Sequence, residues 1–205
     1  MIIRTDIINW YMTQFGYKSY LEIGVQHPDK NFVKINCDKK VGIDPDPNAN
    51  ATYCMTSDNF FEQTKEKFDF IFIDGLHESE QVKKDIENAL KCLSPFGMIM
   101  LHDCNPTTKE MQLVPRQQSE WTGDVWRAFL KMRERNDLFM FTIDDDYGCG
   151  IIIPDGEQEP IYNYNATYEQ FENSKIEWMN LMSWESAKTL SRGIFELKKI
   201  TEKIE

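Results

Sequence analysis

A strand–helix–strand pattern between residues 69 and 104 constrains the fold of this chain more than any other feature. The runs 69–74 (DFIFID) and 98–101 (MIML) are almost entirely apolar, which predicts two strands buried on both faces. Between them, apolar residues recur at helical spacing over 78–93, until a proline and a glycine interrupt the pattern. Buried strands joined by a helix are typical of a parallel βαβ unit, so the sequence predicts an α/β fold.

The rest of the chain supplies further elements for such a sheet. Upstream, the sequence predicts helices near 7–16, 31–36 and 57–67, the last capped by Ser57 or Asp58, and strands at 20–24, 40–44 and 53–55. Downstream it predicts a helix over 123–136 and a hairpin of 139–143 with 150–153, whose aspartates at 144–146 are interpreted as turn residues. The expected fold is an open, mostly parallel α/β sheet with helices on both faces and a terminal antiparallel hairpin. It occupies residues 1–160, and a helical extension over 161–205 is expected to pack on the same domain.

Composition argues against several classes of partner. The chain has 34 acidic and 23 basic residues, a net charge of −11, which repels nucleic acid and anionic membrane surfaces. Its apolar runs fall short of the ~18 residues of a membrane helix, and its first ten residues are too polar for a signal peptide. Five cysteines without a CxxC pair indicate a reduced, cytoplasmic protein.

Ligands bind open α/β sheets beyond the carboxyl ends of the strands, so the residues after each predicted strand are the candidate site. Glu22 and Gly24 end the first strand, and the absence of a GxGxxG motif there argues against a pyrophosphate cradle. Asp44 ends the second strand, about 20 residues further on, where such folds bind a ribose diol. These three residues predict a ligand that has a ribose but no phosphate.

The ends of the two central strands carry a dense group of ionisable residues. Asp74 and His77 follow one strand, and His102, Asp103, a cysteine and Asn105 follow the next. If the strands are neighbours, this group needs cations, a metal or a proton relay. Its oxygen donors suit magnesium and its His and Cys members suit zinc. His77, with an ordinary pKa of about 6.5, is the candidate general base.

Several segments together resemble class I S-adenosylmethionine-dependent methyltransferases. They are YLEIGV, VGIDPDP, MTSDNFFEQ, DFIFIDGLHESEQVKKDIENALKCLSPFGMIMLHDCNP and GDVW, within residues 20–154. Within this family, the chain most resembles the branch that contains macrolide-sugar O-methyltransferases. It implies a Rossmann-like, seven-stranded sheet, with Glu22 and Gly24 near the methionine part of the cofactor and Asp44 on its ribose. Ser57 and Asp58 match the segment that approaches the adenine.

The resemblance also bears on a metal. In metal-dependent relatives, an acid after the fourth strand and an acidic or amide pair after the fifth hold magnesium; Asp74 and Asp103 match two of these positions. The third position falls on Cys104, which is neither Asp nor Asn. The resemblance therefore supports a magnesium requirement only if Asn105 or His77 takes that place. Asp74, His77 and Asp103 are the predicted catalytic residues, Asp74 also lies beside the cofactor, and Asp74, Asp103 and Asn105 are the predicted metal ligands.

The predicted function is methyl transfer from S-adenosylmethionine to a hydroxyl of a small molecule, a sugar or glycosylated metabolite by the branch resemblance. Two alternatives remain. One is an NAD-dependent oxidoreductase or epimerase, which the missing GxGxxG disfavours; the other is a non-catalytic cofactor-binding subunit. The C-terminal aromatic residues can stack on a sugar ring or form a homodimer contact, and the dimer is the preferred interpretation; they are Tyr162, Tyr164, Tyr168, Trp178 and Trp184.

Overall fold

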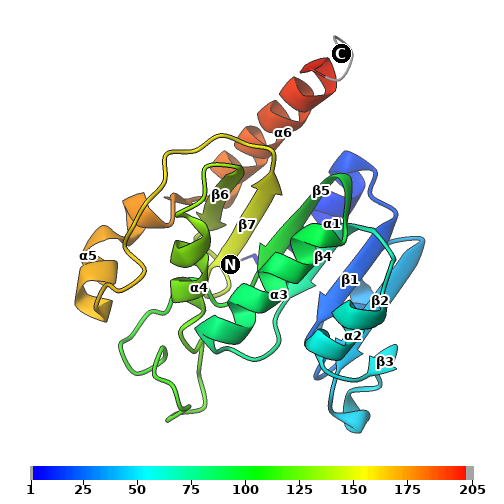
Figure 1. The fold of residues 1–205 in the computed structure, drawn as a ribbon, viewed down its shortest axis with the longest axis horizontal. Helices are drawn as coiled ribbons and strands as arrows, with labels where there is room; N and C mark the ends of the chain where they lie inside the picture. Colours follow the sequence, from blue (N-terminus) through cyan, green and yellow to red (C-terminus); the bar gives the residue numbers. More distant parts are fainter. Residues whose placement is uncertain (1, 202–205) are drawn as a thin grey trace.

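The computed structural model describes residues 2–201, which form one eight-stranded sheet in the order β3-β2-β1-β4-β5-β7-β6-β8. The strands are β1 (Ser19–Ile23), β2 (Lys39–Asp44), β3 (Tyr53–Cys54), β4 (Phe68–Ile73), β5 (Leu93–Leu101), β6 (Leu138–Ile143), β7 (Cys149–Pro154) and β8 (Leu181–Met182). The helices are α1 (Arg4–Phe15), α2 (Ser57–Gln63), α3 (Ser79–Lys91), α4 (Val125–Met132), α5 (Tyr168–Trp178) and α6 (Trp184–Thr201), with short 3-10 turns at Phe32–Lys34 and Pro47–Ala49. Figure 1 shows α2, α3 and α4 in front of the sheet and α1 behind it.

The central βαβ unit and the hairpin are as the sequence predicts. β4 and β5 pair in parallel, and Ile73 lies opposite Leu101, so the residues that follow these strands emerge side by side. β7 pairs antiparallel with both β5 and β6. All of β4 except Asp69 is buried, which explains why its sequence is apolar without alternation. The prediction of a mostly parallel α/β sheet is confirmed.

The two faces of the sheet have separate cores. One core includes Ile71 and Ile73 from β4 together with Val82 and Ile86 of α3. The other includes Phe70 and Phe72 of the same strand together with residues of α1 and α6. Alternate residues of one strand therefore serve opposite faces, and helices cover both.

Three local features differ from the sequence prediction. The sheet has eight strands rather than seven, because β8 pairs in parallel with β6. Helix α2 is capped by Thr56, whose Oγ1 accepts from the Asn59 amide at 3.3 Å, and not by Ser57 or Asp58. β5 begins at Leu93, ahead of the proline and glycine expected to precede it, and an irregularity in its pairing with β4 accommodates the earlier start.

The C-terminal extension docks on helix α1. Tyr11 and Ser191 share a buried hydrogen bond of 2.9 Å, and the rings of Phe15 and Phe195 stack with centroids 4.1 Å apart. The partly buried Trp184 ring packs against a tryptophan of α1 within the same molecule. The homodimer through these helices stays a prediction. None of the helices within residues 2–201 combines the length and apolar character needed to cross a membrane.

Candidate active site

A cavity of about 950 Å³ lies at the carboxyl ends of β1, β2, β4 and β5. β1 stands at its centre, with β2 on one side and β4 on the other, which is where the strand order reverses. The loop between β5 and α4 contributes Trp121 to the wall. The cavity is lined by every candidate site residue that the sequence predicts, apart from Asn105: Glu22, Gly24, Asp44, Ser57, Asp58, Asp74, His77 and Asp103.

Glu22 is a buried carboxyl group at the end of β1. Its Oε2 accepts hydrogen bonds from the Tyr20 hydroxyl at 2.5 Å and from Asn31 Nδ2 at 2.9 Å. Asn31 is itself held by Thr5 of α1, whose hydroxyl donates to Asn31 Oδ1 at 2.7 Å. Burial raises the pKa of Glu22 to about 8, although the two hydrogen bonds oppose the shift. A cationic ligand group beside Glu22 would favour its ionised form.

Gly24 lets the ends of β1 and β4 approach each other. Its φ is +87°, and a Cβ at this position would lie 2.1 Å from the carbonyl oxygen of Asp74. Any other residue would push the backbone of Asp74 away from the floor of the cavity. The sequence shows a single glycine here, and the structure gives it a steric reason.

Asp44 is buried on the cavity wall. Its Oδ2 accepts from the Gln26 amide and its Oδ1 from the Asp46 amide, both at 2.8 Å. The carboxylate therefore joins the loops that follow β1 and β2. Each of its oxygens keeps a lone pair for a further donor such as a ribose hydroxyl.

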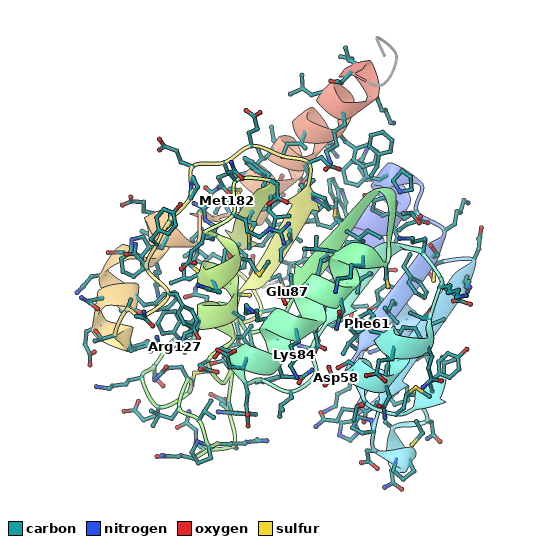
Figure 2. The ribbon with its side chains drawn as sticks, viewed as in Figure 1. Asp58, Phe61, Lys84, Glu87, Arg127 and Met182 are labelled. Atoms are coloured by element: carbon teal, nitrogen blue, oxygen red, sulfur yellow. The ribbon has the colours of Figure 1, made fainter. Side chains whose placement is uncertain are left out.

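Beyond Asp44, the cavity is bordered by residues of α2 and α3. Gln81 Nε2 lies 3.4 Å from Ser57 Oγ, 3.2 Å from Asp58 Oδ1 and 3.1 Å from Asp85 Oδ1. Burial raises the pKa of Asp85 to about 6, against the effect of its hydrogen bonds to Ser57 and Gln81. Figure 2 shows Asp58 beside Lys84 of α3, whose Nζ lies 3.5 Å from Asp58 Oδ2.

Sequence reasoning missed Gln81 and Asp85, although both line the cavity. They lie four positions apart on α3, beside its apolar positions 82 and 86, so they share one face of the helix. Two polar residues at i, i+4 spacing next to the apolar stripe were the available signal.

Two imidazoles and three carboxylates gather beyond β4 and β5. We call Asp74, Asp103, Asp146, His77 and His102 the carboxylate–imidazole cluster. His77 Nε2 lies 3.3 Å from Asp74 Oδ1, and His77 Nδ1 lies 3.2 Å from both Asp103 Oδ2 and the Trp121 carbonyl oxygen. Burial lowers the pKa of His77, but the two carboxylates raise it more, so the net shift is upward.

His102 is more deeply buried than His77. Its Nδ1 lies 3.3 Å from Asp74 Oδ1 and 3.2 Å from Asp103 Oδ1, and its Nε2 lies 3.4 Å from Asp146 Oδ2. Burial lowers the pKa of His102, but the carboxylates hold it well above its usual value. Burial likewise disfavours ionised Asp74, yet His102 and His77 keep the pKa of Asp74 well below its usual range.

Arg4 of α1 completes this group of charges. Its Nε lies 3.7 Å from Asp74 Oδ2, and its Nη1 lies 3.4 Å from Asp146 Oδ2 and 2.8 Å from His102 Nε2. Because a guanidinium only donates, this close contact and a proton on Nε2 of His102 exclude each other. Arg4 and a second imidazole proton therefore compete for the same nitrogen.

Asp146 was predicted only as a turn residue. It does lie in the turn between β6 and β7, with φ +49°, but its side chain reaches Arg4 and His102. β7 runs antiparallel to β5, so the turn before β7 adjoins the end of β5. The pairing of two strands distant in sequence brings this carboxylate into the cluster.

The residues fit a magnesium ion poorly. Asn105, predicted as an oxygen ligand, does not line the cavity: its Nδ2 donates to Asp144 Oδ1 at 2.9 Å, and its Oδ1 is buried without a hydrogen-bond partner among the described residues. Donor atoms of Asp74, His102 and Asp103 do lie within 4.8 Å of one another, close enough for a metal. However, magnesium prefers six oxygen ligands, and here an imidazole and the Arg4 cation stand beside the two carboxylates.

Comparisons with known proteins agree with this architecture. A family model described as a methyltransferase domain matches residues 36–104. The chain resembles the solved structure of an O-methyltransferase from Bacillus cereus in complex with S-adenosylhomocysteine (TM-score 0.55, 14% identity, covering 75% of this chain and 82% of that one). It also resembles an S-adenosylmethionine-bound O-methyltransferase of tomaymycin synthesis from Streptomyces achromogenes (TM-score 0.54, 13% identity, covering 75% of this chain and 80% of that one).

A third similar structure is a methyltransferase from Podospora anserina bound to S-adenosylhomocysteine (TM-score 0.57, 14% identity, covering 78% of this chain and 80% of that one). No curated protein matches the sequence. The predicted fold of the class I methyltransferases is thus confirmed, and residues 36–104 match the model of a methyltransferase domain.

Proposed function

We propose that this protein transfers the methyl group of S-adenosylmethionine to a hydroxyl group of a small molecule. One observation carries the proposal: a single cavity joins the buried acid Asp44, the close backbone approach at Gly24, and the carboxylate–imidazole cluster. A volume of about 950 Å³ lies near the upper end of the range for small-molecule sites, which suits a cofactor and an acceptor together. The family-model match and the cofactor-bound similar structures support the same activity.

The cofactor would lie along the ends of β1 and β2. Glu22 and Gly24 would face its methionine part, and the Asp44 carboxylate would accept hydrogen bonds from both ribose hydroxyls. Ser57 and Asp58 would approach the adenine, now joined by Gln81 and Asp85, which line the same end of the cavity. This arrangement needs no phosphate-binding loop.

The acceptor would lie between the cluster and Trp121. Its oxygen bonds to the sulfonium methyl as the carbon–sulfur bond breaks, and the hydroxyl proton passes to a base. Holding the reacting atoms in line is worth up to about 7–11 kcal/mol in favourable systems. Asp74, His77 and Asp103 would orient the hydroxyl and take its proton as one group, because each imidazole nitrogen of His77 faces a carboxylate.

The acceptor wall is partly apolar. Leu76 is 51% exposed beside the cavity, and the Trp121 ring stacks on His77 with centroids 5.2 Å apart. A sugar ring presents apolar C–H faces and hydroxyl edges, which this combination suits. We therefore extend the proposal to an acceptor that is a sugar or glycosylated metabolite, held by Trp121 and not by the C-terminal aromatic residues, which do not line the cavity.

A nicotinamide-dependent enzyme on the same sheet is disfavoured by the loop after β1. The Gln26 amide donates to Asp44 and is not free to bind a pyrophosphate. A non-catalytic subunit that only binds the cofactor is the second candidate, because Cys104 replaces an expected ligand and is buried.

Release of S-adenosylhomocysteine tests the proposal. The protein is incubated with S-adenosylmethionine and a panel of sugars, glycosides and phenols, and the product is measured by chromatography. Asp74→Asn is expected to bind the cofactor normally and to lose about 10²-fold or more in turnover, as for loss of a proton-transfer group. Asp38→Asn, at an exposed carboxylate far from the cavity, is the control. Full turnover in Asp74→Asn would remove Asp74 from the reaction, and no product with any acceptor would favour the non-catalytic subunit.

A further inference from the structure

We propose that Arg4 is the resident cation of the carboxylate–imidazole cluster and takes the place of a divalent metal ion there. The inference rests on the proposed function only in treating the cluster as the acceptor end of the cavity. It assigns a positioning role to a residue at the start of α1, outside every segment that resembles a methyltransferase.

The charge of the cluster requires a cation. Asp74, Asp103 and Asp146 are three carboxylates, and the imidazoles of His77 and His102 can supply at most two positive charges among them. Such a group is unstable in a buried site unless positive charge lies among its members. The guanidinium of Arg4 contacts Asp74, Asp146 and His102, so it supplies the remaining charge from within the chain.

Arg4 is held in place by its backbone as well as by its side chain. Its amide nitrogen donates to Asp146 Oδ2 at 2.8 Å, and the amide of Ile2 donates to Asp145 Oδ1 at 3.4 Å. One turn further on, Ile7 and Ile8 are fully buried. The guanidinium is therefore positioned by the start of a packed helix, so little side-chain freedom remains to be lost when a ligand binds.

This placement competes with a metal ion for the same carboxylates. An ion between Asp74, His102 and Asp103 would share Asp74 with a guanidinium that cannot be deprotonated. Asn105, the only uncharged oxygen ligand predicted from the sequence, does not line the cavity. Arg4 would hold the Asp74 carboxylate and the His102 ring in place for the acceptor, as a metal ion would otherwise do.

Binding of Mn²⁺ to the full chain, followed by its electron paramagnetic resonance signal, tests this assignment. The experiment uses Mn²⁺ alone, with neither S-adenosylmethionine nor acceptor, so its outcome is independent of methyl transfer. We expect Arg4→Gln to bind one Mn²⁺ at least about tenfold more tightly than the unchanged protein, a change of the size that altered metal surroundings produce. Adding Asp74→Asn to Arg4→Gln should abolish that gain.

Arg192→Gln is the matched control. Arg192 lies on α6, stacks over Trp10 of α1 and donates to Gln14, so its loss removes one arginine and loosens α1 without touching the cluster. Its Mn²⁺ affinity should equal that of the unchanged protein, and Arg4→Lys, which keeps the positive charge, should also exclude the ion.

Two results would overturn the proposal. One is stoichiometric Mn²⁺ binding by the unchanged protein that Asp74→Asn abolishes, which can be measured even if Arg4→Gln fails to fold. The other is a folded Arg4→Gln that binds no more Mn²⁺ than Arg192→Gln does. Failure of the proposed function would look different, because it would leave the Mn²⁺ results intact while no acceptor was methylated.

Discussion

Glu22 shows how one residue links the stability of the protein to its site. The carboxyl group is buried beside Tyr20 and Asn31, and its pKa rises from 4.5 to about 8. The folded protein therefore holds a proton on Glu22 between these two pH values, whereas the unfolded chain releases it. Stability from this group is complete below the unfolded pKa and is lost as pH rises towards the folded one.

We predict that Glu22→Gln removes this pH dependence. The amide oxygen can still accept from Tyr20 and Asn31, but it does not ionise. Relative to the variant, the unchanged protein should lose on the order of 3 kcal/mol of unfolding free energy between pH 5 and pH 8. Chemical denaturation of both proteins at the two pH values measures this difference. Parallel stability of the two proteins across the range would show that Glu22 titrates normally.

Two glycines with left-handed backbone allow the conformational cost of a Gly→Ala substitution to be distinguished from its steric cost. Gly16 has φ +68° and nothing near its missing Cβ, whereas at Gly24 that atom would lie 2.1 Å from Asp74 O. Gly16→Ala should cost only about 1–2 kcal/mol, the price of the backbone conformation. Gly24→Ala should cost several kcal/mol more and abolish cofactor binding, because it displaces Asp74. Thermal unfolding and calorimetry compare the variants, and equal costs would contradict the close approach.

The residues at strand ends were predictable, and those that reach in from elsewhere were not. Asp44, Asp74 and Asp103 each follow a recognisable buried strand, so their position at one edge of the sheet follows from the local sequence alone. Arg4 and Asp146 join them only through tertiary packing of α1 and the pairing of β7 with β5. Asn105 was predicted as a metal ligand in place of Cys104, but its side chain donates to Asp144 and does not line the cavity.

At the scale of elements, α6 packs against α1. Ala187 and Phe195 of α6 are buried in the same core as the apolar side chains of α1, and Phe195 stacks on Phe15. α1 also carries Arg4 and Thr5, which contact His102 and Asn31 of the cavity wall. The packing of α6 on α1 therefore helps to hold these two contacts in place. The helical extension was predictable from its polar, helix-forming composition. β8 was not, since a two-residue strand is too short to show alternation.

Phe195→Ala should destabilise the protein by about 3 kcal/mol, the usual cost of removing a buried aromatic side chain. Leu197→Ala lies on the same helix, but Leu197 is 66% exposed, so it should change stability by no more than about 0.5 kcal/mol. Denaturant unfolding of the two variants measures both values. A similar, small effect for the two substitutions would mean that α6 is not docked as described.

At the scale of the whole molecule, the order of the strands decides where chemistry takes place. β1 lies between β2 and β4, and β5 follows β4, so one cavity collects acids from four parallel strand ends. The antiparallel β7 adds the turn that holds Asp146. Part of the acidic excess that gives the net charge of −11 is therefore concentrated at this edge of the sheet. Arg4 and two imidazoles contact these carboxylates there.

Titration calorimetry with S-adenosylmethionine and with NAD tests the central claim most directly. The unchanged protein and the Asp38→Asn control should bind S-adenosylmethionine and not NAD. Asp44→Asn should bind it about tenfold or more weakly, since a charged acceptor for the ribose hydroxyls is lost. Binding of NAD in preference to S-adenosylmethionine, or an Asp44→Asn variant with unchanged affinity, would contradict an adenosyl site on this cavity wall.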